Sequence, residues 1–474
     1  MPRFSEYFDL KLSQHQLDFV DIDTDCDTPV YVDPYAIEVR NDEWAGAASE
    51  SIRVFFSEVL RALQAEEKNY ATNLMAHLHE PQETFLGVSQ GVPKGRGVGA
   101  RQAKQLINAI SKSKAFETGM LSDLSEMALY VEGIDRDKIS DLTTNIIRHL
   151  LVEYTKQQCL LFGIPVSYYS GPPLWDSARK NWVSREVHLP FIEDSPVLLV
   201  PKYIVRRQLS LNGQEFYNKQ ITDFLMAEHL TANSSLVQVI KGKQKLLKKD
   251  VREAHPRSKQ YVAEFAVAHP EILELYKGIA SRHGAMRTFN DDQPSLSSVC
   301  NRLVPIFSEI ESGRTGANDY HKLVMGVLTA LFYPNLILPQ IEWEIHDGRK
   351  RIDIVFTNAG NNGFFAQRRD DNRTESNAVI VECKNYSDDI ANPEIDQLLG
   401  RFDRNRGKFG IITCRAVDNT EKLNLRLRDA ASRGQGYILV LTDEDLIEML
   451  EAKANLDDNK LEAILFSKYR ELLG

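Results

Sequence analysis

Residues 351–356 read RIDIVF, and residues 378–386 read AVIVECKNY. Both runs are apolar and rich in β-branched residues, so each predicts a core strand of a mixed or parallel sheet. Side chains two positions apart on a strand share a face, so Glu382 and Lys384 project together while Cys383 points to the opposite face. Charges buried at a strand end are costly unless they are paired or bind a metal, and this pattern therefore indicates chemistry.

The charged residues of these two strands have the chemistry of a magnesium site. Asp353 and Glu382 supply hard oxygen ligands, and the backbone carbonyl of Cys383 is a third, a set that suits Mg²⁺, with Mn²⁺ as a substitute, better than Zn²⁺. Lys384 would lie close to the ion, where it orients or deprotonates a water and stabilises negative charge. The alternative is an ion pair between Glu382 and Lys384 on an edge strand.

Asp353, Glu382 and Lys384, in an order of helix, strands, helix and strand, resemble the catalytic residues of the PD-(D/E)xK nuclease superfamily, whose fold is restriction-endonuclease-like. The helix expected at 393–405 carries Gln397, as the corresponding helix does in the Mrr-like branch. Arg401 stands where some relatives have tyrosine, and a strand is expected at 409–415. The resemblance implies that Gln397 orients the catalytic site and that the protein cuts DNA, in restriction or antiviral defence.

The predicted fold class is α/β, with a C-terminal restriction-endonuclease-like core in which helices flank a mixed central sheet. The nuclease domain is expected at residues 286–474, and an α-rich recognition or regulatory region, of α+β type and with a break near 165–200, at residues 1–285. Its further elements are a helix at 319–332, a hairpin of strands 340–345 and 351–356 turned at Asp347-Gly348, a helix at 423–432, a strand at 437–442 and a helix at 443–454. The linker is expected at 282–294.

Several polar residues of this domain are candidates for supporting roles. The first helix of Mrr-like proteins often carries an acidic residue that is absent here, and Asp319 or Glu344 are its candidate replacements. His321 either faces the site or is a capping or partly exposed residue. The loop predicted at 358–377 contains Arg368 and Arg369, which lie near the metal residues in sequence order and are expected to contact phosphates.

Composition places the chain among ordinary globular proteins. It has 474 residues, of which 43% are hydrophobic and 26% charged, and no apolar run long enough for a membrane span. The five cysteines show no C-x-x-C pair and no signal pattern opens the chain, so we expect a cytoplasmic protein without a zinc site. The net charge of −10 does not exclude a local basic groove for nucleic acid.

Two stretches of the N-terminal region are candidates for contact with nucleic acid. Glycines precede the helix expected from residue 100, and the backbone amides there, with three cations, could hold a phosphate of nucleic acid or of an effector; a mobile loop is the alternative. Between residues 241 and 259, eight of nineteen residues are Lys or Arg, which is typical of a solvated helix face but also of a backbone-tracking groove. The candidate contacts are Lys94, Arg96, Arg101, Lys245, Lys248, Lys249 and Arg252.

Other parts of the N-terminal region predict structure only. Helices are expected at 47–67 and, capped by Ser140 or Asp141, at 141–162, and a buried strand at 198–200. An acidic cluster of Asp135, Asp137 and Asp141 either binds a second metal or pairs with Arg136 and Arg148.

The sequence as a whole predicts a magnesium-dependent DNA endonuclease. Because a double-strand cut usually needs two active sites and this chain offers one, a dimer or larger homo-oligomer is expected. One alternative is a nuclease that a ligand or partner protein activates through the N-terminal region. The other is a DNA-binding protein with an inert site.

Overall fold

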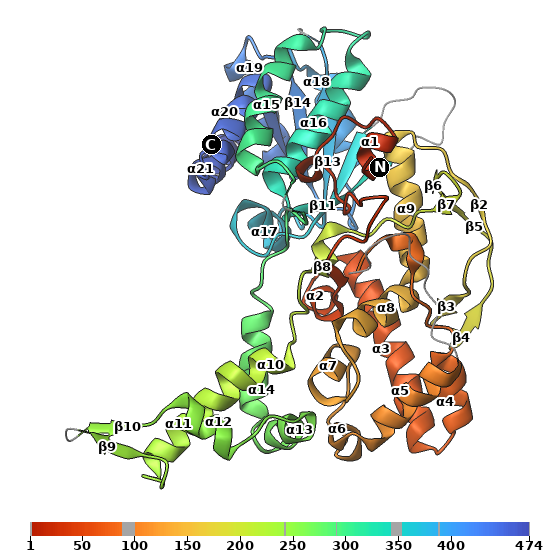
Figure 1. The fold of residues 1–474 in the computed structure, drawn as a ribbon. Coiled ribbons are helices and arrows are strands. Elements are labelled where there is room, and N and C mark those ends of the chain that lie inside the picture. The colour runs from red at the N-terminus through yellow and green to blue at the C-terminus, as the bar shows by residue number, and fades with distance from the viewer. Residues whose placement is uncertain are drawn as a thin grey trace.

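The structure, a computed structural model, describes residues 2–87, 100–240, 243–290, 292–342, 353–386 and 389–473, and for Asp353 it describes the backbone alone. Figure 1 shows a sheet flanked by helices at the C-terminal end of the chain, a helical N-terminal region beside it, and an arm that projects from the N-terminal region. The fold is mixed helix and strand, and the predicted α/β class is confirmed.

The C-terminal unit, α15 to α21, is built around a mixed sheet of five strands among the described residues. The strand order is β11-β12-β13-β14-β15, antiparallel across the first two junctions and parallel across the last two. The strands are β11 (Leu336–Glu342), β12 (Asp353–Asn358), β13 (Ala378–Lys384), β14 (Phe409–Cys414) and β15 (Tyr437–Thr442). The predicted mixed sheet is present, whereas the turn predicted at Asp347-Gly348 lies outside the described residues.

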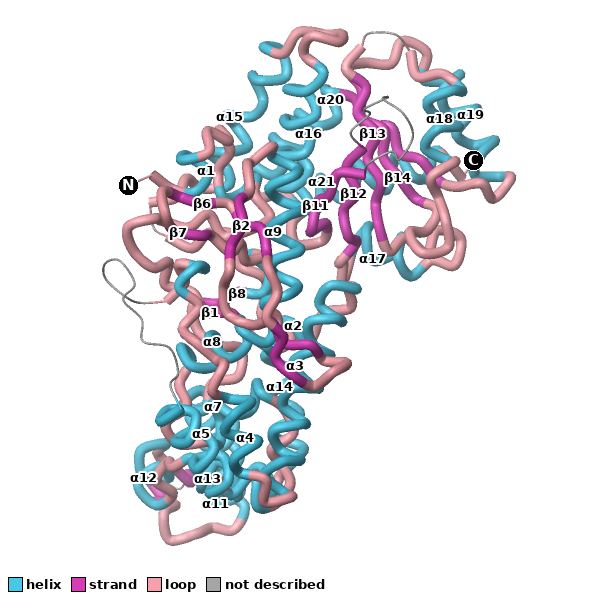
Figure 2. The backbone as a smooth tube through the Cα atoms, turned by 90° about the vertical axis from the view of Figure 1, so that its right-hand side faces the viewer, coloured by secondary structure: helices cyan, strands magenta, loops and turns pink. Residues whose placement is uncertain are grey.

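Helices link and cover these strands. They are α15 (Leu296–Glu309), α16 (Ala317–Phe332), α17 (Gly363–Asp370), α18 (Asn392–Leu399), α19 (Thr420–Ser432), α20 (Asp443–Ala454) and α21 (Asp458–Glu471). α15, α16 and α20 pack on one another, and α18 and α19 connect the parallel strands (Figures 1 and 2). Gly410 on β14 allows α18 to pack closely, because a side chain there would meet Leu398 and Phe402 at 3.1 Å.

Short strands and many helices form the N-terminal region. Its helices are α1 (Phe4–Tyr7), α2 (Pro34–Glu38), α3 (Glu43–Gln64), α4 (Lys68–Met75), α5 (Ala100–Lys112), α6 (Lys114–Glu117), α7 (Met127–Tyr130), α8 (Arg136–Ile146) and α9 (Arg148–Phe162). Its strands pair two by two, antiparallel: β1 (Tyr31–Val32) with β8 (Val205–Arg206), β2 (Ser167–Tyr169) with β5 (Val187–Leu189), β3 (Leu174–Asp176) with β4 (Asn181–Val183), and β6 (Phe191–Ile192) with β7 (Ser195–Pro196). Short 3₁₀ helices lie at Gln14–Gln16 (η1), Gln82–Thr84, Leu124–Glu126 and Lys202–Ile204.

Two local predictions for this region are wrong. The single helix expected at 141–162 is a pair, α8 and α9, and α8 begins earlier because the Asp135 side chain accepts a hydrogen bond from the Lys138 amide at 3.1 Å. Residues 198–200 are buried as expected but do not form a strand. Leu198 and Leu199 instead satisfy their amides with the Glu83 carbonyl and the Thr155 hydroxyl.

The arm consists of α10 (Gly213–Phe216), α11 (Thr222–Thr231), α12 (Lys248–Ala254), α13 (Lys259–Ala268) and α14 (Pro270–Ala280), with a π-helix at Tyr217–Ile221. The antiparallel strands β9 (Gln238–Ile240) and β10 (Lys243–Lys245) lie at its far end (Figure 1). Gln244 on β10 donates to Asn233 at 3.1 Å, which ties one face of the strand pair to the arm. Lys243 and Lys245 alternate with Gln244, so they lie on the opposite face, and both are exposed.

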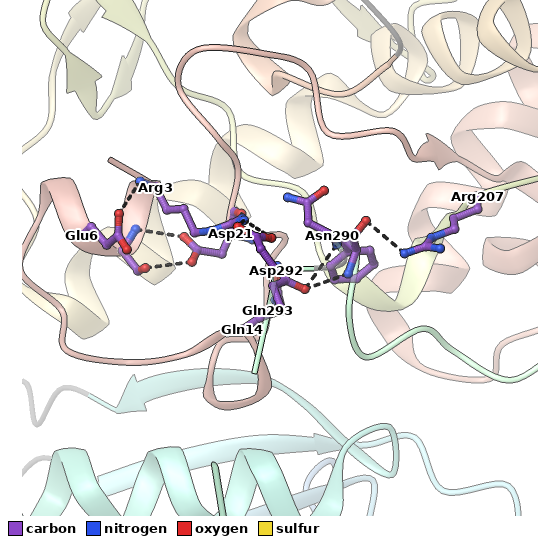
Figure 3. Close-up of polar contacts among 10 residues, drawn as sticks. Arg3, Glu6, Gln14, Asp21, Arg207, Asn290, Asp292 and Gln293 are labelled. Carbon is purple, nitrogen blue, oxygen red and sulfur yellow. Dashed lines mark hydrogen bonds and ion pairs between the residues drawn. The ribbon is translucent and has the colours of Figure 1, made fainter. Parts of the chain in front are cut away.

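The first 22 residues join the N-terminal region to the C-terminal unit. Arg3 forms an ion pair with Asp292 at 2.8 Å (Figure 3). His15 contacts the Pro294 carbonyl at 3.0 Å, so the first segment holds the end of the linker expected at 282–294. Asp18 accepts a hydrogen bond from the Leu338 amide of β11 at 3.1 Å, and η1 packs on α16. The two halves of the chain are therefore in direct contact close to the central sheet.

Candidate active site

Glu382 and Lys384 lie at the C-terminal end of β13, the central strand of the sheet. Glu382 is 2% exposed and Lys384 is 5% exposed. The Lys384 ammonium donates to Glu382 Oε1, so the two side chains lie on one face of the strand as the alternation predicts. Cys383 points away, and burial raises the pKa of its thiol to about 12, which keeps it protonated.

The backbone places Asp353 beside Glu382. β12 and β13 pair antiparallel with Ile354 opposite Val381, and the next position along each strand is Asp353 on β12 and Glu382 on β13. Opposed residues of an antiparallel pair lie about 4.5–5.5 Å apart at Cβ. The two carboxylate positions that the sequence singles out are thus neighbours in the sheet.

Two residues at the end of α18 join this pair. The start of α18 is fixed by Pro393 and by Glu394, whose carboxylate accepts from the Ala391 amide at 3.0 Å. Gln397 Oε1 then lies 3.5 Å from Lys384 Nζ. Arg401, four residues later and on the same side, places Nη1 3.5 Å from Glu382 Oε2. The sequence alone left the role of Arg401 open.

His321 on α16 contacts the same strand end. Its Nε2 lies 3.1 Å from the Cys383 carbonyl oxygen, so the histidine faces the site. Burial lowers the pKa of His321, which the hydrogen bond to the carbonyl opposes only in part. Of the two candidates for a supporting acid, Asp319 is exposed on the first turn of α16 and Glu344 lies outside the described residues.

The residues of this cluster fit a hard cation. Glu382 Oε2 is buried and accepts no hydrogen bond from the described residues, which is the condition of a carboxylate oxygen left for a ligand. With the Asp353 position beside it and the Cys383 carbonyl at the same strand end, the donors would all be oxygens, as Mg²⁺ prefers. Among the described residues, no group of three His, Cys, Asp or Glu side chains is placed to hold a metal. The side chain of Asp353 is not among the described ones.

A network behind the site holds the residue that follows Lys384. Arg415, at the end of β14, donates to Asn385 Oδ1 at 2.7 Å, to Asp443 at 3.1 Å and to the last carbonyls of α15, those of Phe307 and Ile310, at 2.7 and 2.6 Å. Asn385 also donates to the Glu311 and Gly313 carbonyls. Sequence reasoning missed this network, because these partners are 28 or more residues away from Arg415 and no local pattern joins them.

Arg368 and Arg369 are not at the site. They lie on α17, in the connection between β12 and β13 at the end of these strands opposite to Asp353, and the two ends of β12 are five residues, or roughly 17 Å, apart. Arg368 is 5% exposed and its guanidinium stacks 3.7 Å above the Tyr469 ring, so the expected phosphate contact is wrong and its role is packing. Arg369 pairs with Asp370 at 3.1 Å.

The predicted nucleic-acid contacts of the N-terminal region fall into three groups. Lys245 and Arg101 are exposed, whereas Lys94 and Arg96 lie outside the described residues. Lys248 and Lys249 are exposed as well and form surface ion pairs with Asp223 and Glu253, whereas Arg252 donates to the Asn218 carbonyl within the arm.

An acidic cavity of about 380 Å³ lies between α5 and α8. Glu80, Asp137 and Asp141 line it, and burial together with neighbouring carboxylates raises the pKa of Asp141 to about 8. Its charge disfavours an anionic effector at this point. Arg148, one of the expected partners of this cluster, instead forms a buried ion pair with Glu83.

Comparison with known proteins touches the N-terminal region alone. Residues 9–212 match a domain of unknown function (DUF8370). No curated protein and no solved structure matches the chain. Among the described residues, no helix has the length and apolar character needed to cross a membrane. The argument for function therefore comes from the site itself.

Proposed function

We propose that the C-terminal unit is a metal-dependent endonuclease that hydrolyses phosphodiester bonds of DNA, as the resemblance to PD-(D/E)xK nucleases implies. The observation that carries the proposal is the buried pair of Glu382 and Lys384 at the end of a central strand, next to the Asp353 position. A buried ion pair adds little net stability, so fold stability alone does not account for it. A metal site would account for the pair, because Glu382 Oε2 is buried and accepts no hydrogen bond from the described residues.

Each residue has a role that follows from its place. Asp353, Glu382 and the Cys383 carbonyl would hold Mg²⁺ or Mn²⁺, which supplies an activated water and neutralises charge on the phosphate. Lys384, with its ammonium on Glu382 and within 3.5 Å of Gln397, orients the water and donates to the oxyanion. Gln397 keeps the ammonium in place. His321, neutral because of its burial, positions the Cys383 carbonyl.

Control by the N-terminal region is the second candidate, and one observation favours it. Asp18 binds the Leu338 amide of β11, the strand that pairs with β12 and hence with the Asp353 position. A ligand or partner that moved the first 22 residues would act on the sheet directly. A restriction or antiviral role remains an inference from the resemblance.

Incubation of the purified chain with supercoiled plasmid and Mg²⁺ tests the proposal. Nicked or linear product that EDTA abolishes is the expected result. Glu382→Gln keeps the size of the side chain and removes its charge, and it is expected to cut at least about 100-fold more slowly. Exposed Glu444→Gln is the matched control. Equal cutting by the Glu382 variant would place the activity elsewhere, and an intact plasmid would contradict a nuclease that acts without an activator.

A further inference from the structure

Arg401 lies against the Glu382 oxygen that a metal would bind. Glu382 has both its oxygens near cations: Oε1 takes the hydrogen bond from Lys384, and Oε2 lies 3.5 Å from Arg401 Nη1. The Arg401 side chain is 14% exposed, so the pair is only weakly screened by water. Oε2 accepts no hydrogen bond from the described residues, which leaves the guanidinium as a charge partner that does not saturate the oxygen.

The position of Arg401 is set by the end of α18. It follows α18 directly, in a turn held by the hydrogen bond from its own amide to the Leu398 carbonyl at 3.1 Å, while Gln397, one helical turn earlier, stays on Lys384. A guanidinium carries five donors in a planar fork that matches the oxygens of a phosphate, and it stays charged at every physiological pH. One side chain can therefore neutralise Glu382 in the free protein and a phosphate in the complex.

We propose that Arg401 is a further catalytic residue: it holds Glu382 Oε2 until a divalent cation takes that oxygen, and it then binds the phosphate that is cut. This inference rests on the proposed nuclease function. It gives a function to the arginine that this chain has where some similar nucleases have tyrosine. It also predicts an unusual separation of effects, because removing Arg401 helps the metal and harms the reaction.

Binding of Mn²⁺ alone, measured by calorimetry on the whole chain without DNA, tests the competition. Arg401→Gln is expected to bind Mn²⁺ about fivefold more tightly, since one favourable ion pair no longer has to be broken. The same variant is expected to cut plasmid about 100-fold more slowly at saturating Mn²⁺. Arg401→Lys, which keeps the charge without the fork, should show native metal affinity and partial recovery of cutting. Exposed Arg404→Gln is the matched control and should change neither quantity.

The two measurements separate the possible failures. Unchanged or weaker Mn²⁺ binding by a folded Arg401→Gln would refute the competition, and native cutting by that variant would refute the phosphate role. If the native chain binds Mn²⁺ but cuts neither DNA nor RNA, the proposed function fails, together with the phosphate role of Arg401. Tighter binding by the variant would still establish the exchange at Glu382.

Discussion

Arg415 should be one of the most important charged residues for the stability of the C-terminal unit. Its side chain is 10% exposed, donates to Asn385, Asp443 and two helix carbonyls, and stacks 4.6 Å from the Tyr320 ring. Arg415→Met leaves these acceptors buried, among them a carboxylate whose pKa is already raised by burial. Breaking such a buried pair costs about 3–5 kcal/mol. We therefore expect Arg415→Met to lower the melting temperature of this unit by about 8–15 °C.

Calorimetry gives the melting temperature, and hydrogen exchange followed by mass spectrometry locates the loss. Peptides from β13, β14 and the end of α15 should lose protection first, because Arg415 joins these three elements. Arg415→Lys keeps one charge but cannot bridge four acceptors, so it should recover less than half of the loss. Arg428→Met is the matched control, since Arg428 is exposed and contacts one carbonyl. If Arg415→Met melts within about 2 °C of that control, the network is not a determinant of stability.

Three further outcomes are expected. The double variant Lys243→Glu, Lys245→Glu should lower the affinity for duplex DNA, measured by filter binding without Mg²⁺, about tenfold. The slope of log affinity against log salt concentration should become shallower by about 2. Unchanged binding would exclude the arm as a DNA contact. Burial lowers the pKa of His15 to about 4, below its unfolded value of about 6.5. The unfolded state therefore binds the extra proton, and the free energy of unfolding falls by up to about 3 kcal/mol as pH drops from 6.5 to 4. This loss should be absent in His15→Asn, measured by denaturation across the same pH range. Asp18→Ala leaves a tyrosine hydroxyl and the Leu338 amide without their acceptor and should cost about 3 kcal/mol in urea denaturation, whereas a cost below about 1 kcal/mol would show that the first segment is only loosely attached.

Elements set by local pattern could be predicted from the sequence. β15 and α20 have the predicted bounds, because the apolar run 437–442 ends at Thr442, whose hydroxyl accepts from the Asp445 amide and caps the helix. The common face of Glu382 and Lys384 followed from strand alternation alone. In both cases one segment contains all the information.

Contacts between distant segments could not be predicted in this way. The loop expected at 358–377 contains the helix α17, and Arg368 is buried there because Tyr469, about a hundred residues later, supplies a ring for it to stack on. Arg401, just after α18, reaches Glu382 on another strand, and α18 itself packs closely on Gly410 of β14. A long-range partner decides whether an arginine meets a phosphate or a ring, and a single sequence does not reveal that partner.

The claim that Asp353 and Glu382 form one site is tested most directly by the initial rate of plasmid cutting for native chain and Asp353→Asn, side by side in Mg²⁺. Asparagine keeps the size of the side chain and removes the charged metal ligand. The account predicts metal-dependent cutting by the native chain and a loss of at least about 100-fold in the variant. Equal rates, or a native chain that leaves the plasmid intact, would contradict it.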